Sequence, residues 1–341
     1  MQLGYFVLRS RRGYGRNGDV GRIRGLLLLL GVVLLGALLV KIDLRPIVDQ
    51  VRSLSWSLPL LFLPYGLTTI FDTFGWRYAF PGRLLPFSML LPIRLAGKAF
   101  NTATFTATLG GEPVKVYLLR PWVSVEDGVA SVIVDKTIGL LAQTSVLLLG
   151  IAFAYRVLPA GLPLLYAMIG LALLGILAVG GFIMAQQRGL CGRSLKMLTR
   201  LGITWHRGIA AAQELDEAIA TFYATQGRRL ALSYLFHLVA SLVGILEVYL
   251  ILWLVGLPNS FTTAVVIEAF SAAIKAAAFL IPGAIGVEEG GNVAIFLTLG
   301  LTAGDGLSFS LIRRLRELVV MVAGLIALAL IPRSGPIPHP G

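Results

Sequence analysis

The sequence is poor in charge, cysteine and histidine. Only 13% of its 341 residues are charged, against about 25% in an average protein, whereas 57% are apolar. This composition excludes a disordered chain and an ordinary soluble domain. The single cysteine, Cys191, allows no internal disulfide, and three histidines with one cysteine build no convincing metal site. We therefore expect an all-α polytopic membrane protein that uses no metal and no cofactor.

The apolar segments account for nearly the whole chain. A membrane-spanning helix takes about 20 residues, so about eight apolar segments with their connections leave no room for a separate catalytic domain. We expect either six full spans with two re-entrant broken helices, or eight spans. The net charge is +12, but we expect no water-facing domain on which the basic residues could bind nucleic acid. The lysines and arginines are instead expected to set topology and to meet anionic lipid headgroups.

The charge pattern divides the chain into two transmembrane halves with polar segments around them. By the positive-inside rule, the basic flank places the N-terminus in the cytoplasm, and the loop that holds Arg83, Arg94 and Lys98 is expected on the same side. The predicted segments are a tail at 1–24, a first half at 25–185 with a motif loop at 110–120, a basic cytoplasmic connection at 186–229, a second half at 230–332 with a motif loop at 282–291, and a tail at 333–341. The connection contains an amphipathic helix, because Ile209 to Phe222 shows apolar residues at helical spacing.

Two distant stretches resemble each other and predict an internal repeat. The first reads Gly110-Gly111-Glu112, then Asp127-Gly128 and Asp135-Lys136; the second reads Glu288-Glu289, then Asp305-Gly306 and Arg313-Arg314. Each stretch follows a broken apolar segment, at 87–112 and 262–290. If both segments are re-entrant, three spans separate the motif loops and the repeat is inverted; if both cross the membrane, the repeat is parallel. Inverted repeats that meet at broken helices are a common transporter plan, with the substrate site at the midplane.

The broken segments and their charges supply the candidate substrate site. Non-helical backbone at membrane depth occurs where it is buried in protein or lines a wet cavity, and a helix that restarts there offers N–H groups to a lipid phosphate. An ionisable residue in an apolar segment costs about 2.5–3.5 kcal/mol or more and is a functional candidate by default. The candidates are Asn101, Gly111, Glu112, Lys115, Asp135, Lys136, Glu268, Lys275, Gly286, Glu288, Glu289, Arg313, Arg314, Arg316 and Glu317.

Two alternatives stay open for these residues. They line a substrate path, or they form structural ion pairs between the repeats. Arg313 and Arg314 share a helix face with Glu317, whereas Glu268 and Lys275 need partners elsewhere.

His237 and Glu247 are a second, weaker set of candidates. They lie ten residues apart in one predicted span, where they have either a proton-linked role or the role of a satisfied polar pair in the core. No nucleophile–base arrangement, P-loop or dinucleotide loop is recognisable, so we expect no enzyme.

Two ordered motifs resemble those of the lysylphosphatidylglycerol synthase transmembrane (flippase-like) family. The first runs from Asn101 to Arg120 with Gly-Gly-Glu-Pro-Val-Lys, followed by Ala130 to Lys136. The second comprises Pro282 to Gly291 and Ser310 to Leu318. Within the family, the sequence around Glu268 is most similar to hopanoid-biosynthesis-associated membrane proteins, although these often carry Asp in place of Glu112 and Gln in place of Glu288.

The resemblance implies translocation of a lipid, such as a hopanoid or a related lipid, in the cell inner membrane. Full-length synthases of the family add a cytoplasmic aminoacyl-transfer domain; this chain ends ten residues after its last predicted span, so we expect that activity to be absent. Two other functions stay open. One is a membrane-embedded enzyme that modifies lipids with Glu112, Asp135 or Glu289 as acid or base. The other is a scaffold whose partners are lipid-biosynthesis enzymes.

Overall fold

The computed structural model describes residues 26, 29, 55–103, 110–157, 163–192, 206–278 and 286–331. The predicted tails at 1–24 and 333–341, the first predicted span apart from residues 26 and 29, and residues 282–285 of the second motif loop lie outside these ranges. The described residues form helices joined by turns, without a strand. The prediction of an all-α membrane protein is confirmed.

The helices fall into two groups along the chain. The first group is η2 (Ser55–Leu61), α4 (Phe62–Tyr78), α5 (Phe87–Ala103), α6 (Glu112–Leu119), α7 (Val125–Val157) and α8 (Pro163–Gln187). The second group is α10 (His206–Thr225), α11 (Gly227–Leu254), α12 (Phe261–Ala277), α13 (Val287–Thr298) and α14 (Ala303–Leu330). Below, "first half" means α4 to α8 and "second half" means α11 to α14.

Three of the described helices are long and apolar enough to cross a membrane. These candidate spans are Val125–Arg156 in α7, Leu165–Gln187 in α8 and Gly227–Leu254 in α11. α8 exposes many of its large apolar side chains, including Leu173, Leu174 and Leu177, as expected of a helix that faces lipid. α14 is as long as α11, but its central turns carry three arginines and a glutamate.

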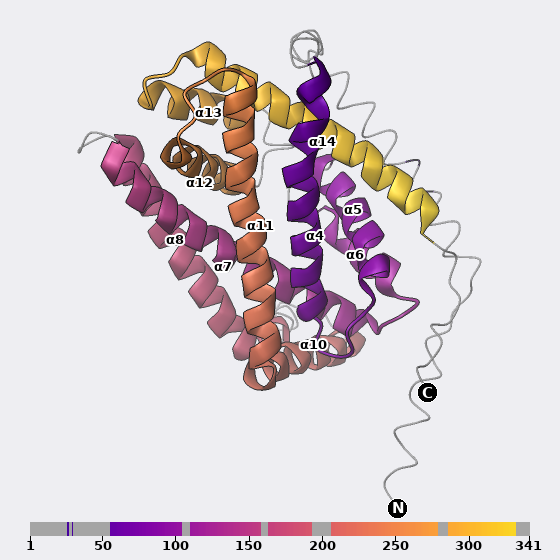
Figure 1. Ribbon diagram of the computed structural model, residues 1–341. Helices are drawn as coiled ribbons and strands as arrows, with labels where there is room; N and C mark the ends of the chain where they lie inside the picture. Colours follow the sequence, from indigo (N-terminus) through magenta and orange to yellow (C-terminus); the bar gives the residue numbers. More distant parts are fainter. Residues whose placement is uncertain are drawn as a thin grey trace, which may run out of the picture.

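The two halves pack through four main helix pairs, of which α7 with α11 is one. α4 and α11 run antiparallel and side by side through the middle of the molecule (Figure 1), and the Ser233 hydroxyl on α11 donates to the Gly75 carbonyl on α4. α5 packs on α14, and α7 packs on α12. Glycines lie at close contacts in two of these crossings: Gly324 of α14 lies against Leu95, and Gly150 of α7 lies against Ala269.

Each half contains a helical hairpin where the sequence predicts a broken segment. α5 ends at Ala103, and the chain has reversed by Gly111, whose backbone lies against the backbone of Gly97 on α5. In the second half α13 packs back on α12, with Gly291 against Ile274. Gly286 precedes α13 with φ of +84°, a left-handed conformation that favours glycine.

The repeated Asp-Gly pairs mark the starts of α7 and α14. The Ser124 hydroxyl accepts a hydrogen bond from the backbone N–H of Asp127, and the Thr302 hydroxyl accepts one from the backbone N–H of Asp305. The Asp305 carboxylate also accepts from the N–H of Thr302, which completes a capping box. The repeated aspartates therefore lie in the first turns of these helices, where they take part in capping.

The predicted amphipathic helix is α10, which lies across one end of the bundle (Figure 1). It buries Ala212, Ile219 and Phe222 and leaves Glu214 and Glu217 exposed. Ile219 and Phe222 belong to a core that also contains Trp76 of α4 and Phe80, which follows that helix. At the same end of the bundle, Arg229 connects α11 to the segment between α4 and α5, because its guanidinium donates to the Gly82 carbonyl over 2.7 Å.

The crossing of α5 and α14 provides a test of the packing between the halves. A Cβ at Gly324 would lie 2.3 Å from the Leu95 carbonyl oxygen, so we expect Gly324→Ala to destabilise the protein by about 1–3 kcal/mol. Gly170 on α8 is the matched control, because a Cβ there meets nothing within 4 Å. Thermal unfolding in detergent should show a lower midpoint for Gly324→Ala and an unchanged or higher one for Gly170→Ala. Equal midpoints would contradict the close crossing.

Candidate functional site

Charged side chains of the first half gather in the interior of the bundle. This first polar cluster comprises Asp72, Arg94, Lys98, Asn101, Glu112, Lys115, Asp135, Lys136 and, from α11, His237. Arg94 sits at the middle of α5, and its guanidinium lies 3.2 Å from the Asp135 carboxylate on α7 and 3.6 Å from Asp72 on α4. Arg94 and Asp135 are both buried, so each neutralises a charge that hydrocarbon could not solvate.

The tip of the first hairpin is organised by Asn101. Its side-chain oxygen accepts from the backbone N–H of Gly111 over 2.7 Å, and its amide donates to the Glu112 carboxylate over 3.3 Å. Glu112 also pairs with Lys115 at 2.7 Å and with Lys136 at 2.9 Å. Glu112 and Lys115 are buried, whereas the Lys136 side chain is 35% exposed. Lys136, which lies on α7, is therefore the most exposed lysine in contact with the tip of this hairpin.

The second half contains a matching set of charges. This second polar cluster comprises Glu247, Glu268, Lys275, Glu288, Glu289, Arg313, Arg314, Arg316 and Glu317. Arg313 of α14 pairs with Glu268 of α12, and Arg316 pairs with Glu247 of α11. All four side chains are at least four-fifths buried.

The second hairpin is held by ion pairs at its tip. Arg314 lies 2.6 Å from Glu289 and 2.7 Å from Glu317. Lys275 pairs with Glu317 and lies 3.4 Å from Glu288, and its side chain is 37% exposed. Lys275 thus resembles Lys136 in being the cation of its cluster most open to a ligand.

The two clusters occupy the same register in the two halves, with one charge pair reversed. Arg94 and Glu268 are each the eighth residue of a 17-residue helix, α5 or α12. Their partners, Asp135 and Arg313, are each the eleventh residue of the long helix that follows the hairpin. Equivalent positions thus carry an ion pair of opposite polarity.

The equivalence extends to the hairpin tips. Asn101 and Lys275 are both the fifteenth residues of their helices, and they contact Glu112 and Glu288 at the starts of α6 and α13. Arg94 and Arg313 each have a buried Nε without a hydrogen-bond partner among the described residues. Each half therefore has a spare N–H donor beside its central ion pair.

Tyr65 of α4 connects the two clusters. The Lys98 ammonium of the first cluster lies 4.8 Å from the centre of the Tyr65 ring, and the Arg316 guanidinium of the second lies 4.5 Å from it. Cations are attracted to an aromatic face, most strongly where water is excluded. The two sets of charges thus meet at one aromatic ring.

The structure brings the predicted site residues together within each half. Asn101, Gly111, Glu112, Lys115, Asp135 and Lys136 lie in or beside the first cluster, and the other candidates, from Glu268 to Glu317, lie around the second hairpin. Glu268 and Lys275 find partners on α14, as expected. Of the two pairs considered for Glu317, Arg314 is its partner, whereas Arg313 pairs with Glu268 of α12.

Several charged residues of the site lie elsewhere than their sequence suggests. Arg94 and Lys98 are not loop residues as expected: they lie inside α5, and Arg94 is buried. Asp72 is not among the site residues predicted from the sequence, although an acidic residue within an apolar stretch was a signal that could have identified it. His237 and Glu247 do not pair with each other, because ten residues place them almost three turns apart.

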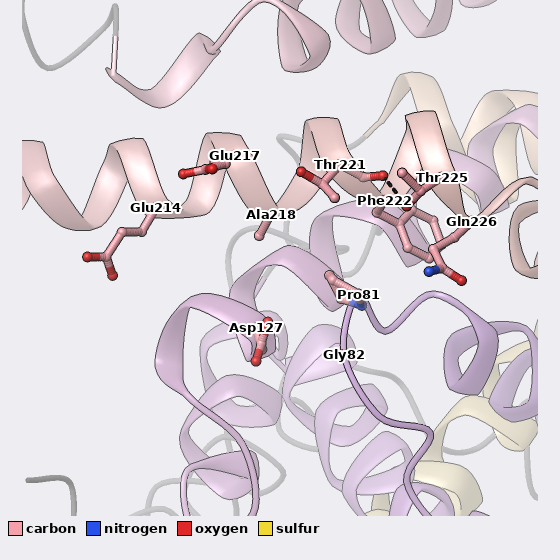
Figure 2. Close-up of a pocket in the computed structure, with 10 residues that line it drawn as sticks. All are labelled: Pro81, Gly82, Asp127, Glu214, Glu217, Ala218, Thr221, Phe222, Thr225 and Gln226. Atoms are coloured by element: carbon pink, nitrogen blue, oxygen red, sulfur yellow. Dashed lines mark hydrogen bonds between the residues drawn. The ribbon is translucent and has the colours of Figure 1, made fainter. Parts of the chain in front are cut away.

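An open cleft of about 360 Å³ lies apart from both clusters, between α10 and the connection from α4 to α5 (Figure 2). Pro81 and Gly82 form one wall, with Asp127 of α7 nearby and Glu214 and Glu217 along α10. The cleft has an acidic lining and lies at the end of the bundle, so it is not part of the polar interior.

The connection between the halves contains Cys191. The Asp216 carboxylate on α10 accepts from the backbone N–H groups of Cys191 at 2.9 Å and Gly192 at 2.6 Å, which ties the end of α8 to α10. Burial and the nearby Asp216 carboxylate raise the pKa of the Cys191 thiol to about 11. Little thiolate is present at neutral pH, so Cys191 is a poor nucleophile.

The fold and the two clusters define a polytopic helical membrane protein with paired charges in its interior. The family model for the lysylphosphatidylglycerol synthase transmembrane region matches residues 23–324, so the chain belongs to this family. It is therefore a membrane protein of lipid metabolism or transport. No individually curated protein and no solved structure matches the chain.

The Glu268–Arg313 pair allows a direct test of the buried electrostatics. We expect Glu268→Gln to destabilise the protein by about 3–5 kcal/mol, because it leaves the Arg313 charge buried without its partner. The exchanged double variant, Glu268→Arg with Arg313→Glu, should recover much of that loss, since the first half carries the same polarity at these positions. Glu214→Gln, on the exposed face of α10, is the control. Thermal unfolding of the single and double variants measures the coupling, and additive losses would contradict a pair.

Proposed function

We propose that this protein translocates a membrane lipid across the cell inner membrane, with the lipid headgroup binding between the two halves. The observation that carries this proposal is the matched pair of charged clusters, which occupy equivalent positions in the two halves and are largely buried among the helices. Charges at membrane depth are costly and mark substrate or ion paths. A purely structural bundle would be equally well served by apolar packing at these positions.

The arrangement of the halves supports an inverted repeat. α4 and α11 are antiparallel, and the pairing of α5 with α14 mirrors that of α12 with α7. We infer that the two hairpins are re-entrant and enter the membrane from opposite sides, with the N-terminus in the cytoplasm. Rocking of one half against the other would then alternate access to a shared central site.

The headgroup contacts come from groups that are exposed or have hydrogen bonds to spare. Lys136 and Lys275 are the most exposed cations of the ion pairs in the two clusters, and they would exchange their carboxylates for a lipid phosphate. The unpartnered Nε donors of Arg94 and Arg313 lie deeper. The similarity to hopanoid-associated proteins suggests hopanoids or related lipids as cargo. We assign no enzymatic step, since the carboxylates of both clusters are engaged in ion pairs.

The test is transfer of fluorescent phosphatidylglycerol between the leaflets of reconstituted vesicles. We expect Lys275→Gln and Lys136→Gln each to slow transfer about tenfold or more, because a hydrogen bond to a charged group contributes about 1.5–3 kcal/mol. Each variant also leaves a buried glutamate, Glu112 or Glu288, with one cation fewer, so unfolding midpoints are measured alongside and transfer is compared at a temperature where all variants are folded. Arg188→Gln, which removes an exposed charge after α8, is the control.

The outcomes separate the alternative functions. Equal transfer by all variants would remove the two lysines from the path, and absence of transfer by the wild-type protein would refute translocation. A lipid product of altered mass would instead indicate an enzyme. A co-purifying lipid-synthesis enzyme together with no transfer would indicate a scaffold. Adding hopanoid as a competitor tests the cargo.

A further inference from the structure

His237 lies between two carboxylates, both from the other half of the protein. Its Nδ1 is 3.1 Å from Oδ1 of Asp72 on α4, and its Nε2 is 2.9 Å from Oδ1 of Asp135 on α7. His237 and Asp135 are buried, whereas the Asp72 side chain is 20% exposed. The imidazole thus joins α11 of the second half to α4 and α7 of the first.

The surrounding helices leave room for an imidazole at this point. A Cβ at Gly75 of α4 would lie 2.6 Å from Nε2, and a Cβ at Gly139 of α7 would lie 3.9 Å from Nδ1. Glycine on α4 therefore lets the ring lie flat against the helix backbone, where both of its nitrogens reach a carboxylate.

The two hydrogen bonds require two protons. A neutral imidazole has one N–H, so its other nitrogen can only accept, and a carboxylate facing that nitrogen would be repelled. The cations nearby keep the acids ionised: Arg94 is 3.2 Å from Asp135, Lys98 is 3.4 Å from Asp72, and Lys115 is 3.9 Å from Asp135. The second proton therefore belongs to the ring, as an imidazolium.

We propose that His237 carries a proton whose uptake and release is coupled to the movement of the two halves during lipid translocation. This inference rests on the proposed function and adds its energy source. Deprotonation turns one of the two hydrogen bonds into a repulsive contact, which loosens α11 from α4 or α7. The contacts of the Arg94–Asp135 and Glu268–Arg313 pairs each stay within one half and would move with it. Protons reach the ring through Asp72, the more exposed of its two partners.

The first test measures the proton count in the wild-type protein. In protein labelled with ¹⁵N-histidine, we expect one of the three imidazoles to be protonated at both nitrogens at pH 7 to 8, and His237→Gln should remove that signal. A His237 ring with one bare nitrogen across this range would overturn the proposal. This measurement requires no transport activity, so it is independent of the proposed function.

The second test measures coupling in vesicles that contain fluorescent phosphatidylglycerol and an internal pH dye. An imposed pH gradient should change the wild-type transfer rate by up to about tenfold per pH unit for one coupled proton, with proton movement reported by the dye. His237→Gln should lose this response. Tyr234→Phe is the control: it removes another hydrogen bond between the halves, to Ser145, and leaves the proton site intact, so its response should be kept.

The results distinguish failure of the two proposals. Wild-type transfer that ignores the gradient would overturn proton coupling and leave translocation standing, whereas no transfer at all would refute translocation. A His237→Gln protein that responds like the wild type would overturn the role of His237. If His237→Gln does not fold, Asp72→Asn provides the same comparison, because it removes one of the two carboxylates that hold the imidazolium.

Discussion

The need to neutralise every charge inside an apolar bundle governs this structure. Burying an isolated ion in such surroundings costs several kcal/mol or more. Arg94, Asp135, Glu268 and Arg313 can therefore be buried as charged groups only when each is paired with an opposite charge. This requirement determines which side chains must meet. Arg94 on α5 needs Asp135 on α7, and Glu268 on α12 needs Arg313 on α14, because each supplies the opposite charge at the matching turn. The apolar packing that remains is non-directional and could accept other arrangements.

The two halves satisfy this requirement in the same register with opposite signs. In the first half the cation, Arg94, is on the shorter helix and the anion, Asp135, is on the longer one. In the second half the anion, Glu268, is on the shorter helix and the cation, Arg313, is on the longer one, so the pairing is kept while the signs are exchanged. Contact between the halves consists of extensive helix packing, of α4 on α11, α5 on α14, and α7 on α11 and α12, and it includes the imidazole of His237. The Arg94–Asp135 and Glu268–Arg313 pairs, in contrast, each lie within one half. The proposed rocking of one half against the other would leave these two pairs intact.

The sequence predicts the helices well, because apolar runs of spanning length and amphipathic spacing are local signals. It places α7, α8, α10, α11 and α14 within a few residues of their bounds. It also singles out most of the charged site, since an ionisable residue in an apolar run is conspicuous.

The pairing of those charges was beyond the sequence, because partners depend on which helices meet. Arg94 and Lys98 resemble the basic residues of a cytoplasmic loop until α5 is seen to include them. His237 has no local signal for its acids, which lie 165 and 102 residues away in sequence. The matching Asp-Gly pairs and charged pairs of the two motifs indicated a repeat, but the reversed ion pair became visible only with the helix bounds.

The claim on which the account depends is that the two hairpins reach a shared polar interior from opposite sides of the membrane. It can be measured with single cysteines placed in a Cys191→Ser background and labelled by a membrane-impermeant maleimide from either side. Pro113 of α6 and Gly290 of α13 are both exposed, and a Cβ at Gly290 meets nothing within 4 Å. The account predicts that Pro113→Cys and Gly290→Cys are labelled from opposite sides. Labelling of both from the same side, or of neither, would contradict it.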